Sequence, residues 1–438
     1  MKAGKHILLT SLVLAAFLAL VGSERAASRQ EATHRVVVTY WEKWTGDEMK
    51  AMKSVVDDFN SSQNRIFVKY LSISGIAEKT LLATSGGNPP DVAGLWTDQV
   101  VQYADSGALM DMMPLAKEVG LGPDHYIPAY WNQMVYKGGL YALATSPGCA
   151  ALHVNRKLMP PEYDTAEEFP KTLGEFDRLV ERISQRDGRG GLKVAGYLPR
   201  QGWGVWPMPY LFGGGYWQED RIDIAGPDDI EAWTWVNSYA KKFGIKETQS
   251  FTAGFGSYNS ALNPFISGKL AVMSDGPWFA SFIKRNGPDL DWFAVPFPYP
   301  DGRPELAGYT MLNLNTLMIP RGAKHPKEAF EFIAYVQRQE VMEKLCTAQM
   351  CNSPLAQVSE KFLSMHPNKE IRVFNKLARS PRAVAPLQIG VATQVGREVG
   401  IAVDEADLGQ KPVEEALKEA QVRVEQAWEK YQRQVLGQ

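Results

Sequence analysis

Hydrophobic and polar residues alternate in a regular order over the first part of the chain. Residues 35–41 form a short apolar run typical of a buried strand, and residues 48–59 carry Met, Val and Phe at helical spacing. The same reasoning predicts a strand at 66–71, a helix at 76–84 and a strand at 91–95. Alternating strands and helices predict a mainly parallel sheet with helices on both faces, and so an α/β fold.

The pattern changes near residue 144, and from there to about residue 300 the chain is dense in Gly, Pro and Trp. A hairpin at 136–144 and a strand at 150–154 mark this change. Further strands are expected at 193–197, 270–273, 292–295 and 312–319. Further helices are expected at 173–183, 230–243, 258–266, 329–335 and, at the end of the chain, 413–434.

The N-terminal run has the pattern of a targeting segment. Lys2 and Lys5 precede an apolar stretch at 7–21, and small residues follow it. This stretch is too short for an ordinary membrane-spanning helix, although an uncleaved anchor is the alternative. We therefore predict a signal peptide at 1–27 and a mature protein that is periplasmic or otherwise extracytoplasmic.

Composition narrows the class of protein. A chain of 438 residues is long enough for two or three domains, and a formal net charge of −2 gives no reason to expect a nucleic-acid partner. Twelve Trp residues indicate a large core, an aromatic-lined site, or both.

The three cysteines have different expected roles. Cys346 and Cys351 are close in sequence, and an exported protein lives where such a pair can oxidise. The sequence leaves this disulfide open, because geometry decides whether it forms. Cys149 is expected to be a small buried residue.

Catalytic motifs are missing from the sequence. It has no His-Glu-x-x-His and no Gly-x-Ser-x-Gly, and Gly268-Lys269 lacks the upstream Gly and the following hydroxyl residue of a phosphate loop. Carboxylates are plentiful, but the sequence cannot pair two of them across a substrate, so a glycosidase stays open. We predict no enzyme activity, no cofactor and no metal.

Five stretches carry a resemblance. They are Gly-Gly-Asn-Pro-Pro-Asp-Val at 86–92, Tyr-Ala-Asp-Ser-Gly-Ala-Leu at 103–109, the segment 136–157, the segment 265–278 that ends in Ser-Asp-Gly-Pro-Trp, and His-Pro-Lys-Glu-Ala at 325–329. In this order they resemble the bacterial extracellular solute-binding proteins of sugar ABC transporters, the group that contains the maltose-binding protein. The segment 136–157 departs from the family's pattern at Ala144, Val154 and Arg156.

This resemblance implies a two-lobed periplasmic-binding-protein fold, with discontinuous lobes and a hinge between them. The first lobe would hold 34–147 plus 313–353, and the second 148–312 plus 354–438. A sugar in the cleft would stabilise the closed form, because it touches both lobes only when they meet. The protein would work as a monomer that delivers the sugar to the permease subunits of an importer.

A sugar site needs flat aromatic walls and polar side chains at the rim. Trp41, Glu42 and Trp44 lie where the first strand meets its helix, and Trp96 and Asp98 lie at the equivalent end of the third strand, where open α/β sheets bind ligands. The resemblance also implies a sugar-binding role for Asp98. The alternatives are one Trp capping the core beside a solvated turn, and Asp98 as a helix N-cap.

In the second lobe, residues 201–207 resemble a stretch of the maltose-binding protein in which a Glu and a Tyr contact sugar, and the resemblance puts Gln201 and Trp203 in those places. Trp203 remains a suitable wall, whereas the loss of charge at Gln201 puts maltose itself in doubt. Trp278, after Gly-Pro at a strand end, is the leading wall candidate. Asp275 beside it is expected either to accept sugar hydroxyls or to cap the following helix.

Two further candidates are Tyr309, near the second crossover between the lobes, and Arg382, in a loop. Tyr309 is a further wall candidate, and Arg382 has the fork to bind two hydroxyls or an acidic sugar, unless it is a solvated loop residue. Two rivals to a sugar carrier stay open. A glycerol phosphate ligand needs a basic cleft, and a secreted carbohydrate-active enzyme needs two opposed carboxylates, for which Glu42 and Asp275 are the nearest candidates.

Overall fold

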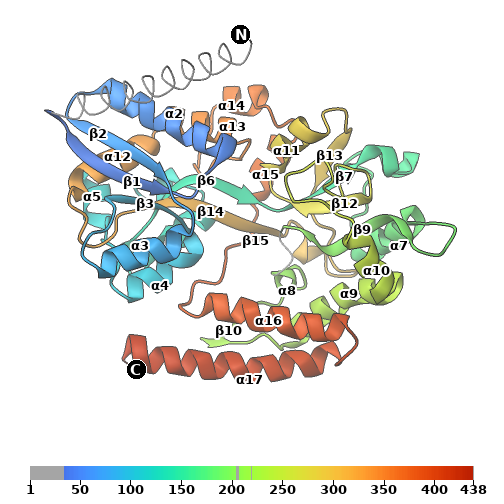
Figure 1. Cartoon of the computed structure of the whole chain (residues 1–438). Coiled ribbons are helices and arrows are strands. Elements are labelled where there is room, and N and C mark those ends of the chain that lie inside the picture. The colour runs from blue at the N-terminus through green and yellow to red at the C-terminus, as the bar shows by residue number, and fades with distance from the viewer. Residues whose placement is uncertain (1–33, 204–206, 219, 438) are drawn as a thin grey trace, which may run out of the picture.

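The computed structural model describes residues 34–203, 207–218 and 220–437 (Figure 1). The predicted signal peptide at 1–27 lies outside these residues. Within them the chain forms two large sheets, each packed against its own helices, and two small two-stranded sheets.

The first sheet has the strand order β15-β14-β3-β1-β2, and β6 also pairs with β14. Strands β1 (Val36–Glu42), β2 (Ile66–Ser72) and β3 (Val92–Trp96) are parallel, as predicted. The prediction of a mainly parallel sheet is wrong for β14 (Thr310–Met318) and β6 (Leu143–Cys149), which pair antiparallel. Both strands link the two halves of the molecule, so they are not part of the βαβ alternation that opens the chain.

Helices cover both faces of this sheet. Helix α2 (Gly46–Ser62) buries the apolar positions predicted from the periodicity, Met52, Val55, Val56 and Phe59 among them. The others around this sheet are α3 (Ile76–Ser85), α4 (Val100–Asp105), α5 (Met113–Glu118), α6 (Pro128–Met134), α12 (Pro326–Val336) and α13 (Gln339–Ala348). The predicted hairpin at 136–144 is a small one, β4 (Val135–Tyr136) with β5 (Gly139–Leu140).

The second sheet has the order β13-β7-β12-β9-β8. Its strands are β7 (Ala151–Asn155), β8 (Gln185–Arg186), β9 (Leu192–Gly202), β12 (Leu270–Asp275) and β13 (Trp292–Val295). Helix α7 (Leu173–Ile183) begins with a capping box between Thr172 and Glu175, which fixes its start. Other elements are α8 (Met208–Leu211), β10 (Trp217–Gln218), β11 (Arg221–Ile222), α9 (Pro227–Phe243), α10 (Ile245–Thr252), α11 (Phe279–Asn286), α14 (Glu360–Met365), α15 (Ile371–Leu377) and β15 (Ala383–Val384).

The helix predicted at 258–266 is wrong, because this segment consists of turns. Asn263 organises them: its Oδ1 accepts from the backbone N–H of Phe265, and its Nδ2 donates to the carbonyl of Tyr258. Pro264 has no N–H for a helical ladder. A side chain that hydrogen-bonds to the nearby backbone competes with helix formation, and here the Asn263 bonds stabilise the turns instead of a helix.

The terminal helix hairpin joins the two halves of the molecule. Helix α16 (Ala392–Asp407) packs on α17 (Val413–Tyr431), which continues as a π-helix over Gln432–Leu436. In Figure 1 α17 runs beneath the molecule toward α4. Its last residue, Tyr431, donates a hydrogen bond of 2.7 Å from its hydroxyl to Asp105 Oδ2 at the end of α4.

The chain passes between the two sheets through paired strands. The expected boundaries at 147/148 and 312/313 fall inside β6 and β14, whose register places Leu314 opposite Pro147. The first sheet thus extends along β6 and β14 toward the second sheet, a connection suited to a hinge.

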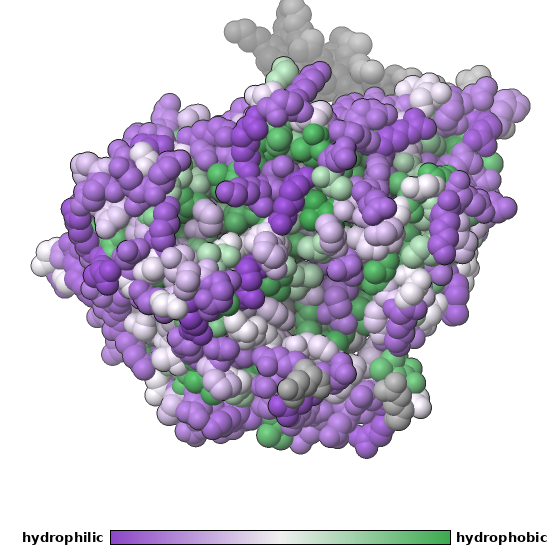
Figure 2. All heavy atoms as spheres, turned by 180° about the vertical axis from the view of Figure 1, so that it is seen from behind, coloured by the Kyte–Doolittle hydropathy of each residue, from purple (hydrophilic) through white to green (hydrophobic). Residues whose placement is uncertain are grey.

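The outer surface is mostly hydrophilic on the side opposite to Figure 1, and hydrophobic residues show mainly in its recesses (Figure 2). No helix among the described residues is long and apolar enough to cross a membrane. Cys149 is fully buried, as predicted, and Cys346 and Cys351 are also buried and free, so the open question of a disulfide is answered with separate thiols here.

Candidate ligand-binding cleft

A cavity of ≈ 280 Å³ lies between the two sheets, and we call it the aromatic cavity. From the first half of the fold come Trp44, Glu48, Trp96, Ser146, Asn313, Asn315, Gln349 and Cys351. From the second half come Trp203, Tyr258, Trp278 and Phe282. The cavity is therefore complete only when the two halves are together.

Trp278 and Trp203 form the wall on the side of the second sheet. Their rings meet edge to face, with centroids 4.9 Å apart and planes at 66°. The Trp278 indole occupies space that a side chain at either Gly148 or Gly276 would fill, since a Cβ at either position would lie 2.2 Å from its Cζ3 atom. Two glycines thus leave room for this ring against the backbone, and they fix its place.

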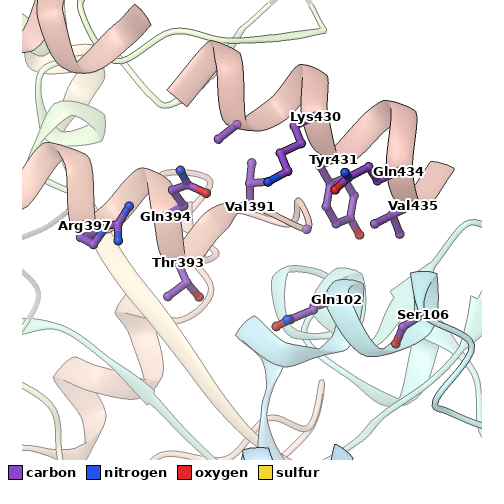
Figure 3. A pocket seen from close by; sticks show the side chains of 12 residues that line it. Gln102, Ser106, Val391, Thr393, Gln394, Arg397, Lys430, Tyr431, Gln434 and Val435 are labelled. Carbon is purple, nitrogen blue, oxygen red and sulfur yellow. The ribbon is translucent and has the colours of Figure 1, made fainter. Parts of the chain in front are cut away.

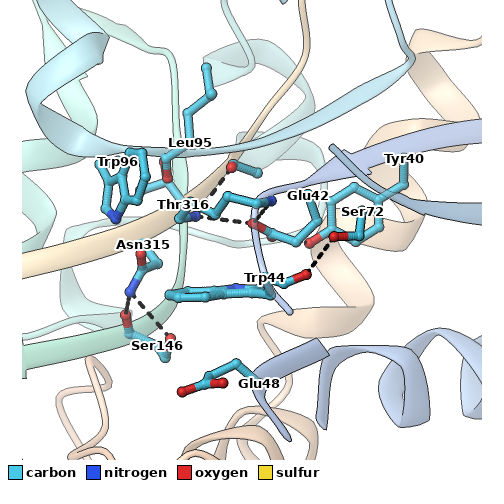
Figure 4. Close-up of polar contacts among 12 residues, drawn as sticks. Tyr40, Glu42, Trp44, Glu48, Ser72, Leu95, Trp96, Ser146, Asn315 and Thr316 are labelled. Carbon is cyan, nitrogen blue, oxygen red and sulfur yellow. Dashed lines mark hydrogen bonds and ion pairs between the residues drawn. The ribbon is translucent and has the colours of Figure 1, made fainter. Parts of the chain in front are cut away.

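Trp44 and Trp96 (Figure 4) form the opposite wall, and the buried ammonium group of Lys43 lies against both rings. The Lys43 ammonium lies 4.4 Å from the Trp44 ring centroid and 4.8 Å from that of Trp96. Lys43 is paired at 3.0 Å with Glu42, which also accepts a hydrogen bond from Tyr40. The pair is almost fully buried, so its charges neutralise each other inside the protein and leave no free charge for a ligand.

Two polar atoms at this cavity are buried without a hydrogen-bond partner. They are the Trp44 indole N–H, a donor, and Asn315 Oδ1, an acceptor. The Asn315 amide is oriented by its Nδ2, which donates to the Ser146 carbonyl at 2.8 Å. Leaving such groups unsatisfied costs about 1–3 kcal/mol each, which a ligand with hydroxyl groups would recover.

The remaining rim of the cavity is polar and almost uncharged. Asn313 and Asn315 project from β14, Ser146 from β6, and Gln349 follows α13. Among the described lining residues, Glu48 is the one charged side chain. The arrangement suits a neutral ligand with many hydroxyl groups and apolar faces.

Asp275 lies behind the Trp278 wall and does not line the cavity. It is fully buried, and its Oδ1 accepts hydrogen bonds from the Tyr258 hydroxyl at 2.6 Å and from the Gly276 N–H at 2.8 Å. The Tyr258 hydroxyl in turn accepts from the Trp278 indole N–H at 2.9 Å. Burial raises the pKa of Asp275 to about 7, against the opposing effect of these hydrogen bonds.

A second cavity, of ≈ 570 Å³, lies between α4 and the α16–α17 hairpin, and we call it the polar cavity (Figure 3). Gln102 and Ser106 face it from α4, and Arg397, Lys430 and Tyr431 from the hairpin. None of its described lining residues carries a buried polar atom without a partner.

Four of the predicted site residues meet in the aromatic cavity: Trp44, Trp96, Trp203 and Trp278. Two others are buried away from it. Glu42 is committed to Lys43, and Asp275 to Tyr258. The predicted helix-cap alternative for Asp275 is not found either, because α11 has Trp278 as its N-cap and no side-chain cap.

The other predicted residues do not line the cavity. Tyr309 is fully buried, where its hydroxyl donates to the Pro207 carbonyl and its ring packs on Phe297. Arg382 donates from Nη2 to the Tyr210 carbonyl. The rest are the half-buried Trp41 and Gln201 and the exposed Asp98, which also does not serve as the N-cap considered for it.

Sequence reasoning missed several lining residues, and two of them stand in a pattern that could have revealed them. Asn313 and Asn315 alternate with Leu312 and Leu314 in the middle of β14, which is the period-2 pattern of a strand with one polar face. Tyr258 was not recognised as a lining residue because the segment 258–266 was wrongly predicted to be a helix. Ser146 and Phe282 carry no local pattern that sets them apart.

Two α/β lobes that enclose an aromatic cavity define a substrate-binding protein of the two-lobed periplasmic type. Comparisons with known proteins agree. The sequence model of the "Bacterial extracellular solute-binding protein" family matches residues 43–343. The chain therefore belongs to this family, whose members are substrate-binding proteins and not enzymes.

Individual relatives are distant. The maltotriose-binding protein of Pyrococcus abyssi is 22% identical over 265 residues, which cover 60% of this chain and 53% of that protein, so the match spans about half of its length. The multiple sugar-binding protein of Streptococcus mutans is 22% identical, with 78% of this chain and 81% of that protein covered.

Solved structures share the fold over most of the chain. The structure titled "CpMnBP1 with Mannotriose Bound" has a TM-score of 0.77 at 26% identity and covers 89% of this chain and 99% of its own. The sugar-binding protein MalE from Xanthomonas citri has a TM-score of 0.74 at 21% identity and covers 92% and 100%.

Proposed function

We propose that this protein is the extracytoplasmic solute-binding component of an ABC importer and that it captures a short, neutral saccharide in the aromatic cavity. The observation that carries this proposal is the pair of unsatisfied atoms, Trp44 Nε1 and Asn315 Oδ1, beside four tryptophan rings. A sugar hydroxyl both donates and accepts, so one saccharide satisfies both atoms while its C–H faces stack on the indoles.

The size and charge of the cavity narrow the ligand class. A volume of ≈ 280 Å³ is just below the roughly 300–1,000 Å³ typical of ligand pockets, which favours one or two sugar rings inside it. Glycerol phosphate is disfavoured, because no cationic side chain is among the described lining residues and Lys43 is neutralised by Glu42. Longer ligands would extend out of the cleft.

Relatives support the saccharide class without naming the sugar. The neighbour with bound mannotriose is 26% identical, and two relatives are named as maltotriose- and multiple sugar-binding proteins. Mannose- and glucose-based oligosaccharides are therefore the first ligands to test.

Delivery and location are part of the same proposal. Residues 1–27 would direct export, and the closed protein would dock as a monomer on the permease subunits of the importer. The lobes would divide as 34–147 plus 313–353 and 148–312 plus 354–438, with β6 and β14 as the hinge.

The test is calorimetric titration of the mature protein with manno- and malto-oligosaccharides, with glucuronate and glycerol phosphate as charged comparisons. Trp278→Ala should weaken the affinity for the bound saccharide by about thirtyfold, or about 2 kcal/mol of lost stacking area. Trp217→Ala removes a half-buried indole outside both cavities and should keep the affinity within about twofold.

Binding of glycerol phosphate in place of any saccharide, or equal losses in both variants, would contradict the proposal. Hydrolysis of a bound oligosaccharide would also contradict it, because Glu48 is the one carboxylate among the described lining residues, and Glu42 and Asp275 are both buried behind the cavity walls.

A further inference from the structure

Trp278 is held in place by a chain of three side chains that ends in a buried carboxylate. The indole N–H donates to the Tyr258 hydroxyl, and that hydroxyl donates to Asp275 Oδ1. Tyr258 lines the cavity, whereas Asp275 is completely shielded from it. The two hydrogen bonds therefore connect Asp275, which cannot reach a ligand in the cavity, to Trp278, whose ring forms a wall of that cavity.

Other contacts confine the same ring without fixing its rotation completely. Gly148 and Gly276 leave a slot for the indole, and Trp203 meets it edge to face. These contacts are apolar, so they restrict where the ring lies but do not direct its N–H. The hydrogen bond from the Trp278 N–H to the Tyr258 hydroxyl supplies that direction, because a hydrogen bond is strong only when donor and acceptor are aligned.

Tyr258 is itself well placed for this task. Its ring packs edge to face against Phe282, with centroids 5.3 Å apart, and tilted on Phe279 at 5.8 Å. A phenol fixed in this way has one orientation for its hydroxyl oxygen, so the Asp275 hydrogen bond sets where the proton points. The oxygen is then free to accept from Trp278.

We propose that Asp275 and Tyr258 are positioning residues that hold Trp278 in its stacking orientation, and that Asp275 does not contact the ligand. This inference rests on the proposed function, since it assigns Trp278 as a saccharide wall. It differs from the sequence-based expectation, in which Asp275 accepts sugar hydroxyls directly. Asp275 sets the affinity through the ring it orients.

The buried carboxylate gives this arrangement a measurable signature. Asp275 Oδ2 has no hydrogen-bond partner, and burial raises the pKa of Asp275 to about 7. As the pH rises through this value the carboxylate ionises and the hydrogen bond from Tyr258 becomes charge-assisted. The Tyr258 oxygen is then a stronger acceptor, so the Trp278 N–H proton resonance should move downfield with rising pH.

Other titratable groups near Asp275 do not produce the same effect. On β7, burial lowers the pKa of His153 to about 3, and burial also lowers the pKa of His366, which precedes the Asn368 amide that bonds the Pro277 carbonyl. The cations of the neighbouring helix α11, Lys284 and Arg285, are exposed, and Arg285 is paired with Asp47. On β9 the residue opposite Ser274 is Gly202.

The experiment follows the Trp278 indole N–H resonance in the ligand-free protein from about pH 5 to about pH 9. The wild type should titrate with a midpoint near the pKa of Asp275. Asp275→Asn keeps an acceptor for Tyr258 but cannot ionise, so this titration should vanish. Asp229→Asn is the matched control, because Asp229 is also fully buried with a pKa raised to about 7 but lies at the start of α9, away from the cavity.

Tyr258→Phe removes one oxygen from the middle of the chain and is the second variant. Its Trp278 resonance should no longer follow pH, and its affinity for the saccharide should fall about fivefold. Its unfolding midpoint should also fall, because the buried Asp275 Oδ1 loses one of two hydrogen bonds, so the affinity is measured well below that midpoint. A pH titration that persists in Tyr258→Phe, or that is lost in Asp229→Asn, would overturn the inference.

The two proposals fail in different ways. If the resonance titrates as described but no saccharide binds, the hydrogen-bonded chain from Asp275 to Trp278 is supported and the proposed function is contradicted. If a saccharide binds Tyr258→Phe with full affinity, the proposed function is supported and the positioning role of Tyr258 is contradicted. If Tyr258→Phe loses affinity but the wild-type resonance ignores pH, Tyr258 contacts the ligand directly and the inference is overturned.

Discussion

The aromatic and polar cavities both lie between the two halves of the molecule, yet they are built in opposite ways. The polar cavity is the larger, ≈ 570 Å³ against ≈ 280 Å³, and its described lining leaves no buried polar atom without a partner. The aromatic cavity holds its four rings by neighbouring side chains and backbone, and leaves a donor and an acceptor unsatisfied. Volume alone therefore does not mark the ligand site, whereas fixed walls with unmet hydrogen bonds do.

The ion pair beside the aromatic cavity is buried, whereas the one beside the polar cavity includes an exposed cation, and this difference predicts the largest effect on stability. Lys43 and Glu42 have 6% and 1% of their side chains exposed, so Lys43→Met leaves a buried carboxylate unpaired and should cost about 3–5 kcal/mol of unfolding free energy. Arg397 at the polar cavity is 65% exposed in its pair with Glu398, so Arg397→Met should cost less than about 1 kcal/mol. Urea unfolding measures both, and equal losses would contradict the distinction.

Gly148 lies against a ring of the aromatic cavity, whereas Gly396 on α16 has open space where a Cβ would lie, so the two form a matched pair for substitution. Gly148→Ala places a Cβ 2.2 Å from the Trp278 ring, so the ring must move and the saccharide affinity should fall about a hundredfold. Gly396→Ala on α16 meets no atom within 4 Å, and should leave affinity unchanged while stabilising the helix by about 0.5–1 kcal/mol. Titration calorimetry decides, and full affinity in Gly148→Ala would mean that Trp278 is not a wall.

The unsatisfied acceptor in the aromatic cavity predicts an intermediate effect. Asn315→Ala removes Oδ1 and should weaken saccharide binding by about fivefold, the worth of one hydrogen bond of about 1 kcal/mol. Thr393→Ala removes a hydroxyl from the polar cavity and should have no effect on the same titration. A larger loss in Thr393→Ala would place the ligand in the wrong cavity for this account.

The contact between α17 and the first lobe predicts the smallest effect. Tyr431→Phe removes the hydrogen bond to Asp105 across the lobes, and Tyr136→Phe removes one to the same carboxylate within the first lobe. The first change should lower affinity by less than about threefold and increase the radius of gyration in X-ray scattering, because lobe closure loses one tie. The second should change neither quantity, and identical behaviour would argue against an interlobe role for Tyr431.

Much of the fold could be predicted because its units are periodic. The strands β1, β2 and β3 and the helix α2 follow directly from apolar spacing. The antiparallel entry of β14 could not be predicted this way, because strand pairing across the molecule leaves no local pattern. The turns at 258–266 were missed because one side chain, Asn263, outweighs the helical spacing around it.

The candidate site shows where such reasoning ends. Four of the five predicted tryptophans line the cavity because they lie at or just after strand ends, whereas Trp41 lies within β1 and does not. Other predicted residues fail to line the cavity because they are buried. Asp275 lies at a strand end and Tyr309 near a crossover, yet both side chains point into the protein. Asn315 matters through an oxygen that its own amide geometry leaves unpaired, and only three-dimensional structure reveals that atom.

The most direct test of the central claim follows the indole N–H resonances of isotope-labelled tryptophan as the saccharide is added. The account predicts that the signals of Trp44, Trp96, Trp203 and Trp278 move together and saturate at the calorimetric affinity, with the largest change at Trp44, whose N–H gains a partner. The signals of Trp217 and Trp428, which pack on each other away from the aromatic cavity, should stay in place. Saturable movement of Trp217 and Trp428 without the other four would contradict the account.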